Sequence, residues 1–504
     1  MRAAIFLLLL PIFGGAHHAH AETKEQHRAV ETALVGLRFQ EATELLASFS
    51  SAPYRAFYQS NLALYRAMSS MDPELRESYR NGWENHVDQL EDMAEQDNLK
   101  EILLADVCAK RAMVEILDHN YLSSVIYARS ARKYLDLSFS KYGRLNDQLK
   151  LEGFFEVILG SLPKKYQWIT RSLGLRGDLQ KGLRYLRTAA AQSQLFNGEC
   201  QLLLALVEKN VLNRPEQTLF RLEQYQQKLP TSSILIDFFL ASGYQSIKQN
   251  EKSLRVLSKK AHYEAQGVFI LPFWDYMLGK GSYFKGDYAA ARVALSHFLS
   301  QYKGALFRTD ANFRLGMAYT LNGQYDQGKK YFSTIVNRGS EENFDEDSYA
   351  AAMATLFLTQ APGPVSLQLF KARNAFDGGY LDLASSLLDQ TRQQYALRPT
   401  ELVEWYYRRA RIHHSNGNMA LAAADYERSI NYTADAYTSW LHAYASFYRG
   451  DIAAESGQKE TAREWYQKAL SYDGYFYQSG LENRCKAAIS QLDRSLPQAS
   501  SNRR

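Results

Sequence analysis

The chain has 504 residues, enough for about three average domains or for one long array of repeats. Apolar residues make up 46% of the sequence, so a large core can form and a disordered chain is excluded. The 59 Lys and Arg residues nearly balance the 54 Asp and Glu residues, and the net charge of +5 predicts no nucleic-acid partner. Only 11 prolines interrupt the sequence, which permits long helices.

The first 21 residues have the pattern of an export signal. Arg2 precedes an apolar run from 3 to 13, and Ala19-His20-Ala21 is the small-x-small pattern that a signal peptidase cleaves. We therefore expect residues 1–21 to be a signal peptide and Glu22 to begin the mature chain, which would be exported to the periplasm or the cell exterior. All later apolar runs are too short for a transmembrane segment.

The cysteines predict neither a disulfide framework nor a metal site. Cys108, Cys200 and Cys485 are odd in number and far apart, and no C-x-x-C pair occurs. Cys108 and Cys200 lie in apolar stretches with helical periodicity, so we expect buried thiols that pack as small hydrophobic side chains. The sequence predicts no metal and no cofactor.

Glycines recur in the C-terminal half, and three of their four spacings are 37, 38 and 40 residues. Each is followed by a small residue and then, four positions later, by a large one. The first two, Gly286 and Gly323, are 37 residues apart, and five copies of the pattern cover 270–475. The turn glycines are Gly286, Gly323, Gly379, Gly417 and Gly457. The small residues are Ala291, Gly328, Ala384, Ala422 and Ala462, and the large ones are Leu295, Phe332, Leu388, Tyr426 and Tyr466.

This pattern resembles the tetratricopeptide repeat, a helix–turn–helix unit of roughly 34 residues. A glycine between the two helices adopts a left-handed conformation without steric cost, which allows a sharp turn. The small residue lies where the two helices cross, and the large residue fills the gap to the next unit. The resemblance implies an all-α fold, a right-handed superhelical solenoid of tetratricopeptide-type helix pairs.

The block at 151–190 carries a second resemblance. It combines an apolar helix at 154–159, the stop Ser161-Leu162-Pro163, a second apolar helix at 168–175 and a glycine-containing turn at 177–183. The block is similar to one in a eukaryotic tetratricopeptide family that includes the fungal inclusion-body clearance protein, and the likeness extends loosely over 30–340. This resemblance implies a non-enzymatic adaptor, which in that family is associated with membranes or protein quality control.

The domain limits follow from these patterns and from one strong helix breaker. Ala361-Pro362-Gly363-Pro364 ends any helix at that point. We expect a signal peptide at 1–21, an N-terminal helical region with degenerate repeats at 22–160, a repeat array at 161–358, a break at 359–366, a C-terminal repeat array at 367–493 and a tail at 494–504.

In a solenoid of this kind the first helix of each pair lines a concave groove, and its inward positions here are mostly aromatic or basic. The predicted partner-binding residues are Phe273, Tyr276, Lys280, Tyr283, Phe313, Tyr407, Arg411 and His414. In one interpretation the rings stack on an extended peptide or a sugar while Lys280 and Arg411 pair with carboxylates. In the other, the rings pack between repeats, since the chain has 34 tyrosines in all. The Lys and Asn arrangement of chaperone-tail-binding tetratricopeptide domains is absent.

The sequence contains no motif of a known catalytic class. It has no GxxxxGK[ST], HExxH or GxSxG, so we predict that the protein is not an enzyme. The favoured function is an exported scaffold or adaptor that binds protein or peptide partners. The alternative is a glycan-binding accessory protein of outer-membrane nutrient uptake, similar to other tetratricopeptide-containing binders. Those proteins usually carry a lipoprotein cysteine and long loop insertions, and neither is visible here.

Overall fold

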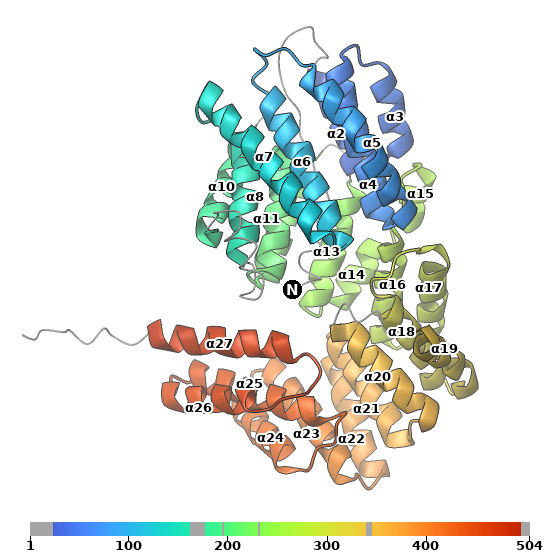
Figure 1. The fold of residues 1–504 in the computed structure, drawn as a ribbon. Coiled ribbons are helices and arrows are strands. Elements are labelled where there is room, and N and C mark those ends of the chain that lie inside the picture. Colours follow the sequence, from blue (N-terminus) through green and yellow to red (C-terminus); the bar gives the residue numbers. More distant parts are fainter. Residues whose placement is uncertain (1–23, 162–176, 194–195, 230–231, 339–344, 495–504) are drawn as a thin grey trace, which may run out of the picture. The chain divides into compact units, whose positions relative to one another are not determined.

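The computed structural model describes residues 24–161, 177–193, 196–229, 232–338 and 345–494, and within these ranges the chain is helical and contains no strand. This confirms the all-α prediction. The chain forms two compact units, one made of Met1–Met277 with Ser300–Gly304 and the other of Leu278–Leu299 with Ala305–Arg504 (Figure 1). The predicted signal peptide lies outside the described residues, as do residues 162–176 of the block at 151–190.

The first unit is built from antiparallel helix pairs. Its helices are α2 (Lys24–Val35), α3 (Phe39–Ala47), α4 (Ala52–Ser70), α5 (Pro73–Glu91), α6 (Lys100–Leu117), α7 (Tyr121–Tyr142), α8 (Gln148–Ser161), α10 (Leu179–Gln192), α11 (Asn197–Asn210), α12 (Pro215–Gln226), α13 (Ile234–Ser246), α14 (Asn250–Leu257), α15 (Lys260–Ala265) and the first turns of α16 (Pro272–Lys285). Helices α4 and α5, α6 and α7, and α8 and α10 pack as pairs, and the first helices α4, α6 and α8 also contact one another in that order. This stacking of first helix on first helix is the arrangement of a solenoid.

The first helix pair of this unit also contacts a segment much later in the sequence. The backbone N–H of Phe269 donates a 2.9 Å hydrogen bond to the carbonyl oxygen of Leu37, and the Ser233 hydroxyl donates one of 3.2 Å to the carbonyl oxygen of Val35. The rings of Phe39 and Phe269 lie 5.4 Å apart. In an open array each repeat contacts only its neighbours, so these contacts close the first unit upon itself.

The second unit continues the array with more regular pairs. It holds the rest of α16, most of α17 (Tyr288–Gln301), α18 (Arg308–Leu321), α19 (Tyr325–Arg338), α20 (Asp345–Thr359), α21 (Pro364–Gly378), α22 (Leu381–Gln394), α23 (Pro399–Ser415), α24 (Met419–Asn431), α25 (Ser439–Glu455), α26 (Lys459–Leu470) and α27 (Gln478–Arg494). Helices α21, α23, α25 and α27 lie side by side, each contacting the next. The predicted breaker separates α20 from α21, with Pro364 in the first turn of α21. The domain limits drawn from the sequence stay a prediction.

The pattern of glycines and small residues has the structural role that the sequence predicts. The turn glycines have positive φ, for example 83° at Gly286 and 80° at Gly323. A Cβ on Gly316 would lie 2.6 Å from a ring carbon of Phe332, and one on Gly328 would lie 2.4 Å from the carbonyl oxygen of Gly316. The helices of this pair therefore approach so closely that no side chain fits between them.

The three cysteines are buried free thiols, and the burial of Cys108 and Cys200 agrees with the prediction. No helix in the described part of the chain combines the length and the apolar character needed to cross a membrane.

Candidate functional site

The predicted groove residues of the first unit are part of its core. The side chains of Phe273 and Tyr276 are buried and contact each other edge to face at 6.5 Å. The ring of Phe273 also lies 5.1 Å from that of Tyr302. These rings pack between repeats, so they offer little surface to a partner.

The predicted residues on α16 and α18 in the second unit are also largely enclosed. Tyr283 and Phe313 are buried, and Phe313 lies among the rings of Phe332 and Phe357 at 5.9 and 6.4 Å. The half-buried Lys280 places its Nζ 5.7 Å from the ring centroid of Phe284. Burial, together with the nearby Arg314 charge, lowers the pKa of Lys280.

The remaining predicted residues, Tyr407, Arg411 and His414, lie together on α23. Tyr407 is buried, whereas Arg411 and His414 are half-buried. Arg411 Nη1 donates a 3.1 Å hydrogen bond to the Tyr407 hydroxyl. His414 Nδ1 is 3.3 Å from the Tyr426 hydroxyl, and its ring lies 6.0 Å from that of Tyr448. Like Lys280, Arg411 and His414 are polar and only half-buried, and they differ from Lys280 in lying together on one helix.

Three further side chains, those of Tyr444, Tyr448 and Arg484, complete this surface. The guanidinium carbon of Arg411 lies 4.1 Å from the ring centroid of Tyr448 on α25, and that of Arg484 on α27 lies 5.5 Å from the same centroid. Tyr444 is one helical turn before Tyr448, with a ring separation of 6.3 Å. We call the surface formed by Arg411, Tyr444, Tyr448 and Arg484 the basic–aromatic face.

Sequence periodicity could have revealed part of this face. Tyr448 follows Tyr444 at a spacing of four and so lies on the same side of one helix. Arg484 follows the last recognised repeat, in a helix that has no partner helix after it in the described chain. Arg484 reaches Tyr448 because α27 packs on α25, and the repeat pattern does not predict that packing.

The acidic side chains around this face are already engaged. Glu404 accepts a 2.7 Å hydrogen bond from the Arg408 guanidinium, and Asp451 accepts one of 2.8 Å from the Tyr466 hydroxyl. Burial raises the pKa of Asp451, although this hydrogen bond and the arginine charges oppose the effect. Asp451 keeps its charge and acts on both arginines, but the two arginines outnumber it, so the face carries a net positive charge.

A second group of aromatic side chains in this unit packs around Tyr349. The ring of Tyr349 on α20 lies 5.4 Å from Phe476 and 5.9 Å from Tyr477, both in the connection between α26 and α27. Arg373 Nη1 donates a 2.7 Å hydrogen bond to the Tyr349 hydroxyl. The half-buried Tyr477 also contacts Trp440 at 5.9 Å. These contacts pack the connection between α26 and α27 against α20 and α25.

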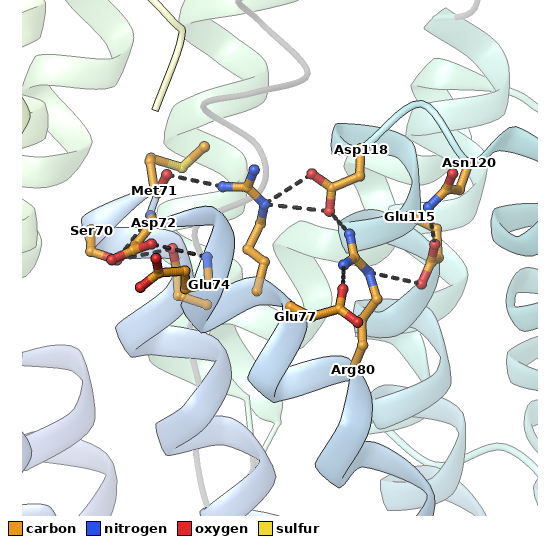
Figure 2. Close-up of polar contacts among 11 residues, drawn as sticks. Ser70, Met71, Asp72, Glu74, Glu77, Arg80, Glu115, Asp118 and Asn120 are labelled. Carbon is orange, nitrogen blue, oxygen red and sulfur yellow. Dashed lines mark hydrogen bonds and ion pairs between the residues drawn. The ribbon is translucent and has the colours of Figure 1, made fainter. Parts of the chain in front are cut away.

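The arginines of α5 in the first unit are, by contrast, neutralised. Figure 2 shows Arg80 directed toward Asp118 and Glu115, and its Nε is 3.5 Å from Glu115 Oε1. Asn120 Nδ2 donates a 2.9 Å hydrogen bond to Glu115 Oε2, and Arg111 Nε donates one of 2.7 Å to Glu115 Oε1. This network joins α5, α6 and the start of α7, and it is structural.

A second network lies in the interior of the first unit. Lys150 pairs with Asp106 and, at 2.7 Å, with Glu199, while Lys110 pairs with Asp106 and donates a 3.2 Å hydrogen bond to Asn61. All of these groups are buried, and they come from α4, α6, α8 and α11. Among the described residues, no group of three or more His, Cys, Asp or Glu side chains is placed to hold a metal ion.

Three stretches of the chain match known protein-family models. Models of the tetratricopeptide repeat match residues 310–338, 403–435 and 445–475. The chain contains tetratricopeptide repeats. The matched segments correspond to α18 with α19, to α23 with α24, and to most of α25 with α26, so two of the three carry helices of the basic–aromatic face.

Other comparisons add nothing on function. No curated protein matches the chain. The chain is similar to solved structures of the APC/C hetero-tetramer Cut9-Hcn1 (14% identity, 94% of this chain and 91% of that chain, TM-score 0.28) and of the P58(IPK) TPR domain (11%, 84% and 96%, TM-score 0.21). It is also similar to Naa15/Naa10 bound to HypK-THB (10%, 93% and 78%, TM-score 0.23). TM-scores this low support no argument.

Proposed function

We propose that the chain is an exported scaffold without enzymatic activity that binds a protein partner on the basic–aromatic face of its second unit. Tetratricopeptide repeats are in general protein-interaction modules and not catalysts, which supports the scaffold role. The export part of the proposal rests on the pattern of residues 1–21.

The observation that supports this face most strongly is the combination of half-buried tyrosine rings with two arginines that contact them. Tyr444 and Tyr448 are half-buried, and Arg484 is exposed. Tyrosine and arginine are the side chains that contribute most to protein interfaces, because they offer large contact area and hydrogen bonds at low entropic cost. Lys280 and the rings of Phe273, Tyr276, Tyr283 and Phe313 support this face only indirectly, by forming the cores of the helix pairs before it.

The test is affinity capture from the native compartment with three forms of the full chain. Arg411→Glu reverses a charge on the proposed face, and the matched control Lys486→Glu reverses one on α27 at an exposed residue that is ion-paired with Glu482 at 2.8 Å. We expect a defined set of proteins to co-purify with the wild type and with Lys486→Glu but not with Arg411→Glu. If the same set co-purifies with all three forms, the partner binds elsewhere. If no protein co-purifies with any form, the scaffold proposal fails.

A further inference from the structure

The buried network of the first unit brings two positive and two negative side chains together in the interior. Lys150 on α8 contacts Asp106 on α6 and, at 2.7 Å, Glu199 on α11. Lys110 on α6 contacts the same Asp106. These four residues, which we call the buried charge cluster, are each 1–4% exposed. An ionised group without its hydration shell is costly, so burial favours the neutral form of every member.

The geometry shows which two members are compensated least. Asp106 is paired with two lysines, whereas Glu199 is paired within the described residues with Lys150 alone. Lys110 shares Asp106 with Lys150, and it donates a 3.2 Å hydrogen bond to the uncharged amide of Asn61 on α4. Glu199 and Lys110 are therefore the members that lose their charge most readily.

We propose that the buried charge cluster is a pH-sensitive joint, at which α8 and α11 are held on α4 and α6 most weakly near neutral pH. In the closed state Glu199 takes up a proton from solvent on the acid side of neutrality, and Lys110 releases one to solvent on the alkaline side. Either step removes one ionised group from the interior, which favours the closed packing of the four helices.

The pKa shifts of the members agree with this assignment. Burial raises the pKa of Glu199 from its usual 4.5 to about 7, although the charges of Lys150 and Lys110 oppose the effect. Burial lowers the pKa of Lys110 from 10.5 to about 7, although the charge of Asp106 opposes it. Burial acts on Lys150 too, but the charges of Asp106 and Glu199 outweigh it and raise the Lys150 pKa. Lys150 therefore stays charged while Glu199 and Lys110 titrate.

Two further titratable groups face the cluster and stay uncharged over the same pH range. Tyr65 on α4 and Cys200 on α11 are fully buried, and burial raises the pKa of each well above its usual value. The nearby charge of Glu31 adds to this effect at Tyr65, as does Tyr225, and the charge of Asp147 adds to it at Cys200. Tyr65 and Cys200 therefore contribute no charge to the cluster.

The sign of the effect follows from proton binding in the closed state and in an open state in which water reaches the cluster. Between pH 4.5 and 7 the closed state holds a proton at Glu199 that the open state has lost, so rising pH favours opening. Between pH 7 and 10.5 the open state holds a proton at Lys110 that the closed state has released, so rising pH favours closure. The joint is therefore weakest near pH 7 and tightens in acid.

The test is hydrogen–deuterium exchange of the full-length chain, measured by mass spectrometry from about pH 5 to about pH 9 and corrected for the intrinsic exchange rate at each pH. Peptides from α8 and α11 report on the joint, and peptides from α24 in the second unit are the internal reference. Glu199→Gln and Lys110→Met are compared with the wild type. The matched controls are Glu216→Gln and Lys228→Met, at exposed residues of the same unit.

In the wild type we expect the protection of α8 and α11 to fall by up to about tenfold per pH unit from about pH 5 to 7, and to rise again toward pH 9. Glu199→Gln should abolish the fall on the acid side, because its side chain holds no titrating proton. Lys110→Met should abolish the rise on the alkaline side for the same reason. Both control variants should keep the minimum near pH 7.

Several results would overturn the inference. A wild-type profile without a minimum near neutral pH does so, as does a fall on the acid side that persists in Glu199→Gln or disappears in Glu216→Gln. Circular dichroism melting identifies a single variant that does not fold. The double variant Lys110→Met with Glu199→Gln then replaces it, since it removes one charge of each sign and leaves the pair of Asp106 and Lys150. The double variant should give a flat profile, and a minimum retained there contradicts the joint.

Discussion

The backbone N–H of Phe269 donates a hydrogen bond of 2.9 Å to the carbonyl oxygen of Leu37, although the two residues are far apart in the sequence. The ring of Phe39 packs against that of Phe269, and in the same unit Lys303 Nζ lies 2.9 Å from Asp72 Oδ2. The first helix pair of an open solenoid has no such contacts. In this chain they cover an edge that would otherwise need a polar capping surface.

Removing the ring of Phe39 should weaken this closure. Phe39 is 8% exposed, and Phe39→Ala should lower the free energy of unfolding by about 3 kcal/mol because a large buried side chain is lost. Phe220→Ala, at a residue that is 67% exposed, is the control and should cost less than about 0.5 kcal/mol. Denaturant titration measures both. Equal effects would show that the contact with Phe269 does not stabilise the unit.

The close crossing of α18 and α19 predicts a strong effect of a single methyl group. Gly328→Ala places its Cβ against the carbonyl oxygen of Gly316, which cannot move as a side chain can, and should cost about 1–3 kcal/mol. Gly480→Ala on α27 meets open space and should stabilise the protein by up to about 1 kcal/mol, since alanine is the better helix former. Thermal melting of the two variants checks the opposite signs; a neutral Gly328→Ala would contradict the crossing geometry.

Asp347 predicts a stability that falls as the pH rises. Burial, with the nearby Asp310 charge, raises its pKa from the usual 3.8 to about 7, although its Oδ1 accepts a 2.9 Å hydrogen bond from the Asp310 N–H. Between these two values the unfolded chain loses the Asp347 proton while the folded chain retains it, so rising pH favours unfolding by at most about 1.4 kcal/mol per pH unit. Below 3.8 and above 7 the two states bind the proton equally, and this contribution no longer changes.

Asp347→Asn removes that titration and keeps an oxygen acceptor. Urea unfolding at a series of pH values should show a smaller loss of stability between pH 4 and 7 in Asp347→Asn than in the wild type. Parallel pH profiles for the two proteins would show that Asp347 is already ionised in the folded state at acidic pH.

The export signal has a direct test. The chain expressed in its host should begin at Glu22 when it is recovered from the exported fraction, because cleavage is expected after Ala21. Intact-mass and N-terminal peptide mass spectrometry measure the start. A chain found in the cytosol that still contains residues 1–21 would remove the export part of the proposal.

The regular half of the fold was predictable because its signals are local. A turn that requires positive φ selects glycine, as at Gly417 and Gly457, and a tight helix crossing selects a small residue, as at Ala422, which is fully buried. Each helix pair imposes these constraints again, so the same residue types recur along the sequence and can be recognised without an alignment. The prediction of an all-α solenoid needed nothing more.

The contacts that shape the basic–aromatic face are not local, so the sequence predicted them only in part. The position of Arg411 in its repeat predicts that it lines a groove, but its contact with Tyr448 depends on the packing of α23 beside α25. The same repeat position predicts a groove role for Lys280, yet its neighbours Phe284 and Arg314 place it in a half-buried site with a lowered pKa. The closure of Leu37 on Phe269 has no periodic signal at all.

Photo-crosslinking from Tyr444 is the measurement that tests the central claim most directly. p-Azidophenylalanine, close to tyrosine in shape, replaces Tyr444 on the basic–aromatic face in one full-length chain and Leu421, which is 55% exposed on α24, in another. Illumination in the native compartment should give a discrete protein adduct from position 444 and little or none from position 421. Equal adducts from both positions, or an adduct from 421 alone, would contradict the assignment of partner binding to this face.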